Sequence, residues 1–170
     1  MESALTIQLR NTGIHSRFVD GVVREDGFQL DEAVAPILAE AACVKTTDDV
    51  TCLQTHRAAL LFLRDRLLAR LDPATGLYST LQDSEDEYSK QPFLTYDNVL
   101  TWRTLQDLAV LLERLKDPPK AREMAQRTES LRKAILQFCV SDQAPGSAGT
   151  VFVFPRTARA QFSRMFLPGP

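Results

Sequence analysis

The sequence predicts an all-α fold in which four helices form two antiparallel hairpins. Four stretches of the chain repeat apolar residues at the 3.6-residue period of an amphipathic helix. A short polar or proline-containing break separates the two helices of each pair, and a long acidic and aromatic loop separates the pairs. Short connections join antiparallel neighbours, so these breaks predict two successive hairpins.

Residues 1–30 are predicted to be an irregular N-terminal segment. Residues 5–9 alternate apolar and polar side chains, as a short half-buried strand does. Turn-forming residues follow at 11–13, 20–21 and 26–27. We therefore expect turns here, with at most one short strand.

Residues 31–140 are predicted to be the helical-hairpin domain. Its first hairpin joins helices over 31–45 and 49–71 through the polar break at 46–49. Asp31 can cap the first helix, because its carboxylate accepts hydrogen bonds from free backbone N–H groups. The second helix buries a stripe of leucines, namely Leu53, Leu60, Leu61, Leu67, Leu68 and Leu71.

The second hairpin joins helices over 97–115 and 118–139. Asp97 or Asn98 can cap its first helix. The break at 116–119 places proline at the start of its second helix, where a missing N–H costs least. Both helices have an apolar stripe that includes Leu105, Leu108, Leu112, Met124, Leu131 and Ile135.

Residues 141–170 are predicted to be an irregular tail. The tail contains four prolines and three glycines, which interrupt regular elements. Residues 151–154 have the composition of a strand, but no partner strand is evident near them.

Composition and charge exclude several classes of protein. The chain has 20 Lys and Arg against 22 Asp and Glu, a formal net charge of -2, so it lacks the basic excess of nucleic-acid or anionic-membrane binders. No apolar run approaches the ~20 residues that span a bilayer, and no secretory signal is visible at the N-terminus. Three cysteines without a CxxC spacing indicate free thiols in a reducing, cytoplasmic compartment.

No metal site or cofactor is expected. The two histidines, His15 and His56, are far apart in the sequence, and we identify no ligand partner for them at helical spacing. His56 is predicted to be a partly exposed helix residue. The cysteines are predicted to be small buried apolar residues; they are Cys43, Cys52 and Cys139.

Residues 29–138 resemble the six-hairpin glycosidases, in which twelve helices form an (α/α)6 toroid. The similar segments are Gln29-Leu30-Asp31-Glu32, the break at 47–49, the turn at 71–78 and the run from 92 to 118. The toroid needs at least roughly 200 residues for its helices and connections. The resemblance therefore implies a partial toroid of two hairpins.

The loop between the hairpins looks most like that of the metal-independent exo-α-mannosidases. The similarity lies in the order Gly76-Leu77, Ser84-Glu85-Asp86, Phe93-Leu94 and Asn98. The sequence departs from that family at Leu81-Gln82-Asp83, and its loop is one residue longer. Trehalases, glucoamylases and related β-glucosidases share the toroid, so the resemblance implies a glycoside hydrolase without specifying its sugar.

Three acidic residues are candidate catalytic groups. Glycoside hydrolysis needs one carboxylic acid for the leaving oxygen and a second carboxylate about 5–9.5 Å away. Asp86 is the first candidate for the acid, because it matches the family's Ser-Asp-Asp step, and Glu85 is the alternative to it. Asp97 is a candidate because β-glucosidase relatives place an acid after a similar Thr-Tyr step. The non-catalytic alternatives are an acidic loop that is exposed to solvent and, for Asp97, a helix cap.

Candidate substrate-binding residues lie in or beside this loop; they are Tyr78, Asp83, Tyr88, Tyr96 and Trp102. Aromatic faces stack on the C–H surfaces of sugars, so this cluster is suited to a carbohydrate partner. Packing of aromatic residues where the hairpins meet is the alternative, above all for Trp102.

Two functions follow from these observations. The first is a fragment of, or a domain derived from, a glycoside hydrolase acting on oligosaccharides, without the second carboxylate that the resemblance places on a later hairpin. The second is an α-helical repeat-like scaffold that binds a protein partner. We expect no hydrolysis by this chain alone, unless a homo-oligomer supplies the missing group.

Overall fold

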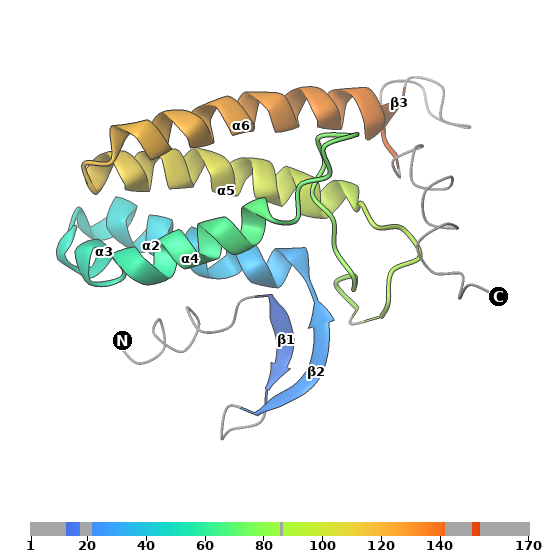
Figure 1. The fold of residues 1–170 in the computed structure, drawn as a ribbon, viewed down its shortest axis with the longest axis horizontal. Coiled ribbons are helices and arrows are strands. Elements are labelled where there is room, and N and C mark those ends of the chain that lie inside the picture. The colour runs from blue at the N-terminus through green and yellow to red at the C-terminus, as the bar shows by residue number, and fades with distance from the viewer. Residues whose placement is uncertain (1–12, 18–21, 86, 142–150, 154–170) are drawn as a thin grey trace.

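A computed structural model describes residues 13–17, 22–85, 87–141 and 151–153 of the chain. Helices make up most of this part (Figure 1). They are α2 (Leu30–Thr47), α3 (Thr51–Thr55), α4 (Arg57–Leu68), α5 (Thr95–Arg114) and α6 (Pro118–Phe138). The predicted all-α fold with two helical hairpins is therefore confirmed, and two short strand pairs are added to it.

Helix α2 belongs to the first hairpin and packs against the second. Helices α5 and α6 run side by side as one hairpin, and α2 packs against both α4 and α5 (Figure 1). The predicted apolar stripes face one another in this arrangement, because burial removes their leucines from water. Fully or almost fully buried residues include Leu53, Leu60, Leu67, Leu105, Leu108, Leu112, Met124 and Leu131.

The predicted helix over 49–71 is divided by His56 and ends earlier. Residue His56 has φ −90° and ψ 3°, outside regular α-helix, and separates α3 from α4. Its side chain is 7% exposed, so the prediction of a partly exposed histidine is wrong. The imidazole is buried because it contacts the Glu40 carboxylate of α2. Among the cysteines, Cys139 is buried as predicted, whereas Cys43 and Cys52 are half-buried.

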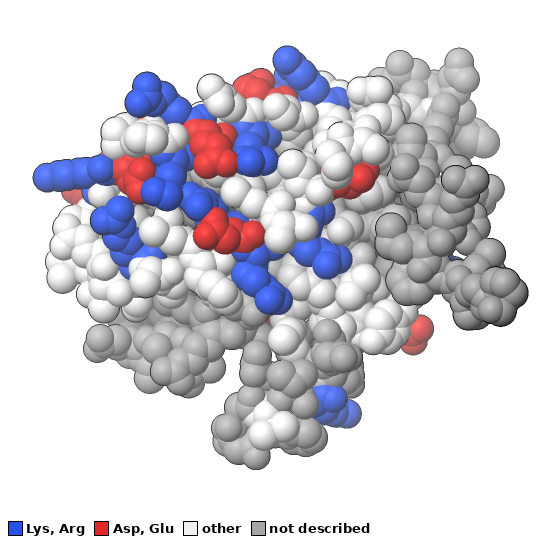
Figure 2. All heavy atoms as spheres, in the orientation of Figure 1, with Lys and Arg blue, Asp and Glu red and all other residues white. Residues whose placement is uncertain are grey.

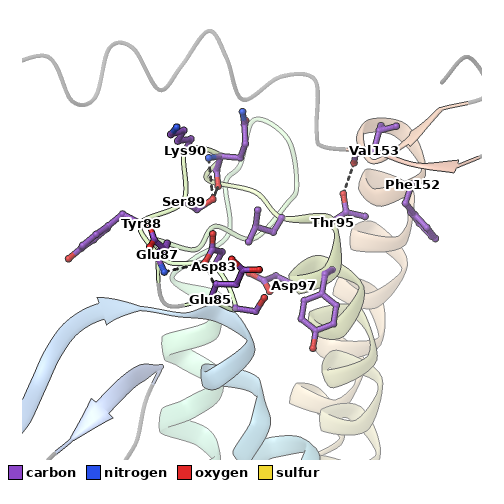
Figure 3. Close-up of a pocket in the computed structure, with 14 residues that line it drawn as sticks. Asp83, Glu85, Glu87, Tyr88, Ser89, Lys90, Thr95, Asp97, Phe152 and Val153 are labelled. Carbon is purple, nitrogen blue, oxygen red and sulfur yellow. Dashed lines mark hydrogen bonds between the residues drawn. The ribbon is translucent and has the colours of Figure 1, made fainter. Parts of the chain in front are cut away.

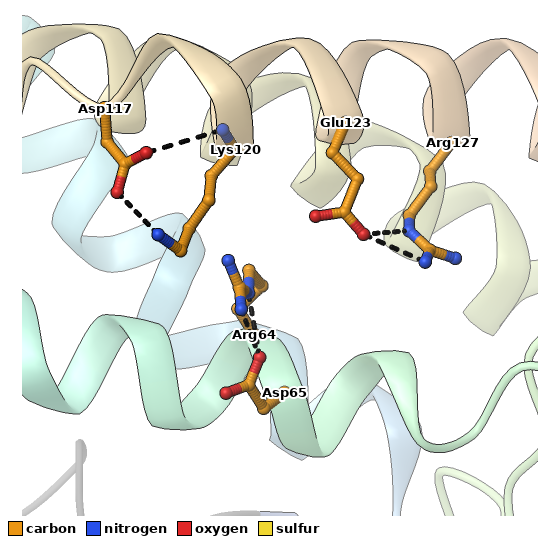
Figure 4. A network of polar contacts seen from close by, with 6 residues as sticks. All are labelled: Arg64, Asp65, Asp117, Lys120, Glu123 and Arg127. Atoms are coloured by element: carbon orange, nitrogen blue, oxygen red, sulfur yellow. Dashed lines mark hydrogen bonds and ion pairs between the residues drawn. The ribbon is translucent and has the colours of Figure 1, made fainter.

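Helix α6 begins with a proline, as the sequence predicts, and the structure adds an aspartate cap. The Asp117 carboxylate accepts from the Lys120 backbone N–H at 3.4 Å and from Lys120 Nζ at 2.8 Å (Figure 4). Further along α6, Glu123 pairs with Arg127 at 2.9 Å. Such solvent-exposed pairs typically contribute only ~0.2–1 kcal/mol each. The stability of α6 therefore comes mainly from its buried stripe.

The N-terminal segment contains a strand pair where turns were expected. Strand β1 (Ile14–Arg17) pairs antiparallel with β2 (Val23–Phe28). The turn predicted at 26–27 is wrong, since Gly27 lies within β2. A Cβ atom there would collide with the Gln82 side chain, so this glycine permits close approach rather than a turn. The strand predicted at 5–9 lies outside the described residues.

The C-terminal residues contain the strand partner that was not evident from sequence. Strand β4 (Val151–Phe152) pairs antiparallel with β3 (Val140–Ser141), which directly follows α6. The Val153 N–H donates to the Cys139 carbonyl at 2.8 Å. The prediction of an irregular tail is thus wrong for the two strand residues 151–152, Val153 follows that strand without regular structure, and the rest of 142–170 lies outside the described residues. The domain limits at 30/31 and 140/141 stay predictions.

Two surface properties can be assessed on the described part. None of its helices is long and apolar enough to cross a membrane. On the face shown in Figure 2, basic and acidic side chains are interspersed. The ion pairs on this surface include Arg64–Asp65, in which Arg64 Nη2 contacts Asp65 Oδ1 (Figure 4).

Candidate functional site

An open pocket of about 710 Å³ lies at the end of the helices where α5 begins (Figure 3). The loop between α4 and α5 forms one wall, and the first turn of α5 forms another. Residues Phe152 and Val153, from the C-terminal strand, also line it. The lining includes Asp83, Glu85, Glu87, Tyr88, Lys90, Thr95, Tyr96 and Asp97. The predicted acidic and aromatic loop therefore borders a real pocket.

Asp97 is the most buried acidic group of the pocket. Its residue is 2% exposed, and its Oδ2 has no hydrogen-bond partner among the described residues. Burial, together with the negative charges of Asp31 and Asp83, raises the pKa of Asp97 to about 7. A substantial fraction of this carboxyl group is therefore protonated at neutral pH and can donate a proton.

Neither proposed cap residue caps α5. The N-cap is Leu94, whose side chain makes no capping bond, and Asp97 is the third helical residue. The sequence-based alternative of an aspartate cap is wrong, because the helix starts two residues earlier than predicted. The Asp97 side chain is then left in the pocket wall rather than over the helix end (Figure 3).

Asn98 holds the inter-hairpin loop against α5. Its Oδ1 accepts from the Tyr78 N–H at 2.7 Å, and its Nδ2 donates to the Tyr78 carbonyl at 3.0 Å and the Leu94 carbonyl at 2.9 Å. This residue is fully buried, and its two bonds to Tyr78 satisfy backbone groups of a residue that is itself buried. Asn98 thus fixes the position of the neighbouring Asp97.

Asp83 organises the acidic turn. Its Oδ1 accepts from the backbone N–H groups of Glu85 at 3.0 Å and Glu87 at 3.2 Å. Gln29 Nε2 donates to the Asp83 carbonyl at 3.1 Å, which ties the turn to the start of α2. Glu85 and Glu87 are exposed at the pocket, whereas Asp86 lies outside the described residues.

The predicted aromatic residues separate into two groups. Tyr88 and Tyr96 line the pocket and are 69% and 61% exposed, as stacking surfaces must be before a ligand binds. Tyr78 is 1% exposed and lies in the core. Trp102 on α5 is half-buried and packs against the same core. Tyr78 and Trp102 therefore serve packing, which was the stated alternative for Trp102.

Several residues at the pocket were not predicted from the sequence. Thr95 Oγ1 donates to the Val153 carbonyl at 2.6 Å and so attaches the C-terminal strand beside the pocket. Lys90 is the one basic residue among the described residues that line it. The Thr95–Val153 contact joins residues 58 apart in the chain, and no local sequence signal indicates it.

Separately, Glu40, Cys52 and His56 lie close together elsewhere in the fold and offer ligand atoms for a metal.

Comparison with known proteins identifies a similar fold. No family model matches the sequence, and no curated protein matches it. Among solved structures, the chain is similar to a metal-independent α-mannosidase from Streptococcus pneumoniae, determined in a non-productive complex with α-1,6-mannobiose. The TM-score is 0.77 and the sequence identity 12%, and the match covers 94% of this chain and 48% of that chain.

The chain thus spans about half the length of that mannosidase. An identity of 12% with a TM-score of 0.77 is evidence of a shared fold. The order of the helices and the partial coverage both agree with the two-hairpin arrangement implied for residues 29–138. The described helices therefore have the fold of one part of a toroid glycosidase.

Proposed function

We propose that this chain is a fragment of, or a domain derived from, a glycoside hydrolase, and that its acidic pocket contacts an oligosaccharide. The observation that carries this proposal is Asp97. It is a buried carboxyl group in the wall of an open pocket, with one oxygen that has no partner among the described residues. Cleavage of a glycosidic bond requires such a group, protonated near neutral pH, next to the leaving oxygen.

Asp97 takes the role of general acid in this proposal. Burial favours its protonated form, so it holds a proton at a pH where an exposed aspartate is ionised. Asp86 and Glu85 stay candidates through the resemblance to the α-mannosidases. Asp83 is supported as a positioning residue, because its carboxylate is engaged by two backbone N–H groups.

Tyr88 and Tyr96 are proposed to stack on the sugar. Both are exposed at the pocket, and they offer apolar faces beside its acidic groups. Lys90 and the exposed carboxylates can hydrogen-bond to sugar hydroxyl groups. The mannosidase with the similar fold was determined in a complex with α-1,6-mannobiose, so a manno-oligosaccharide is the first ligand to test.

The chain alone is proposed to bind without hydrolysing. The second carboxylate must lie across the sugar from the acid, about 5–9.5 Å away. The acidic groups of the pocket come from one loop and one helix start, which together form one side of a cleft. The chain spans about half the length of the similar mannosidase, which supports the view that an opposing wall is missing.

Titration of the ¹⁵N-labelled chain with α-1,6-mannobiose tests the proposal. We expect saturable NMR shift changes for backbone amides around Tyr88, Tyr96 and Asp97, weakened severalfold in Tyr88→Ala. The matched control is Tyr78→Phe, which changes a tyrosine in the core and leaves the pocket intact. Circular dichroism confirms that both variants fold.

Shift changes confined to the far end of the helices would contradict the assignment of the pocket. No saturable change with manno- or gluco-oligosaccharides would favour the alternative of an α-helical scaffold for a protein partner. Equal weakening in Tyr88→Ala and Tyr78→Phe would show that the effect is on stability and not on sugar contact.

A further inference from the structure

Glu40, Cys52 and His56 form a compact group in the first hairpin. Glu40 lies on α2, Cys52 on α3, and His56 between α3 and α4. The His56 Nδ1 atom is 3.2 Å from Glu40 Oε2 and 3.4 Å from Cys52 Sγ. One ligand atom from each residue lies within 4.8 Å of the others. The expectation that His56 lacks a ligand partner at helical spacing is wrong, since Cys52 precedes it by four residues.

Hydrogen bonding leaves this group incompletely satisfied. Glu40 is 0% exposed and His56 is 7% exposed. The Oε1 atom of Glu40 has no hydrogen-bond partner among the described residues. The same His56 nitrogen contacts both the carboxylate and the sulfur, and one ring nitrogen cannot donate to the first while accepting from the second. A buried carboxylate oxygen without a partner is costly, which calls for a further group at this place.

A divalent cation meets these requirements. Zinc binds sulfur at roughly 2.3 Å and nitrogen or oxygen at roughly 2.0–2.2 Å, so neighbouring ligands around a tetrahedral ion lie roughly 3.3–3.6 Å apart. The distances from His56 Nδ1 to Glu40 Oε2 and to Cys52 Sγ, 3.2 and 3.4 Å, are close to that range. A carboxylate, a thiolate and a neutral imidazole carry two negative charges together, which the ion neutralises. The buried group is then neutral as a whole.

The identity of the donors favours zinc over harder cations. Thiolate and imidazole suit Zn²⁺, whereas Mg²⁺ and Ca²⁺ prefer oxygen ligands only. Cys52 is half-buried, so an ion can reach the site from solvent. The site lies near α3, at the opposite end of the helices from the pocket loop (Figure 1). Its role is therefore structural, connecting α2, α3 and α4, and it is separate from any reaction at the pocket.

We propose that Glu40, Cys52 and His56 bind one Zn²⁺ ion, with Glu40 Oε2, Cys52 Sγ and His56 Nδ1 as ligands and with Glu40 Oε1 or a water molecule completing the coordination. Binding releases the proton of the Cys52 thiol to solvent, because the metal takes the thiolate form. His56 binds as neutral imidazole, and no other bond is made or broken.

Titration of the full chain with Zn²⁺, and with Co²⁺ as a spectroscopic probe, tests the site. We expect one equivalent of Zn²⁺ by calorimetry, and a thiolate-to-cobalt charge-transfer band that Zn²⁺ displaces. Cys52→Ser should abolish the band and weaken Zn²⁺ binding by at least about 10-fold, because loss of a ligand costs no less than loss of an outer partner. The matched control, Cys43→Ser, removes a half-buried thiol from α2 and should retain both signals.

Thermal unfolding gives an independent measure. A free Zn²⁺ concentration a hundredfold above the Kd should raise the Tm by roughly 5–10 °C, and Glu40→Gln should lose this increase. Glu40→Gln keeps the size of the side chain, so it tests the ligand without a cavity.

A measurement on the unsubstituted chain covers the case in which a variant does not fold. Zn²⁺ should slow alkylation of Cys52 by iodoacetamide, mapped by mass spectrometry, and leave Cys43 unaffected. Absence of one-equivalent binding, or binding and protection that do not involve Cys52, would overturn the proposal. In that case the three residues form a hydrogen-bonded group alone.

Discussion

Replacement of Asp97 by asparagine should make the stability of the protein less dependent on pH. The residue is 2% exposed, and burial, with the charges of Asp31 and Asp83, raises its pKa from 3.8 to about 7. At ~1.4 kcal/mol per pH unit, this difference corresponds to about 4 kcal/mol of free energy for ionising the buried group. Asp97→Asn keeps the size of the side chain and cannot ionise.

The sign follows from proton binding. Between pH 3.8 and about 7 the folded protein holds a proton on Asp97 that the unfolded chain has released. The free energy of unfolding therefore falls as pH rises through this range, and the contribution of Asp97 levels off above pH 7. Below pH 3.8 both states hold the proton, so ionisation of Asp97 removes none of the free energy of unfolding.

Urea unfolding at pH 5 and pH 8 measures the effect. Between pH 5 and pH 8 the free energy of unfolding should fall by about 2–3 kcal/mol more in the unsubstituted chain than in Asp97→Asn. This is the part of the ionisation free energy of Asp97 that falls within this pH range. The comparison cancels contributions of other groups, among them Asp49 and Asp117, whose pKa values are lowered by hydrogen bonds. Glu129→Gln, on the exposed side of α6, is the control for loss of one acidic side chain. An equal pH dependence in the chain and in Asp97→Asn would refute a neutral, buried Asp97.

Three further predictions follow from particular contacts. Gly27→Ala should destabilise the fold by about 1–3 kcal/mol in urea, because the new Cβ collides with the buried Gln82 side chain; in a Gln82→Ala background the same substitution should cost much less. Asn98→Ala should lower the Tm clearly, by the loss of about 2–4 kcal/mol, since it leaves the Tyr78 backbone unpaired; an unchanged Tm would contradict the role given to Asn98. The purified chain should show only background hydrolysis of aryl α-mannosides, aryl β-glucosides and trehalose, and turnover that Asp97→Asn or Asp86→Asn abolishes would disprove this.

The sequence by itself determined the helices and the loop that borders the pocket. Leucines at a 3.6-residue period have one energetically favourable arrangement, in which the stripes of neighbouring helices bury one another. Proline at the start of α6 and the polar break at 46–49 placed the helix ends within each hairpin to within about two residues, because those signals act locally. Acidic and aromatic residues crowded between two hairpins indicated where a pocket would lie.

Tertiary structure alone decided the environment of each side chain. Asp97 is a buried acid rather than a cap because α5 starts at Thr95 and places it in the pocket wall. Tyr78 belongs to the core rather than to the pocket, since its backbone N–H donates a hydrogen bond to the buried Asn98 side chain. Glu40 and His56 meet across 16 residues of chain. Burial, the distance between charges and contacts between distant segments depend on the packing of the whole chain, and no local pattern of residues encodes them.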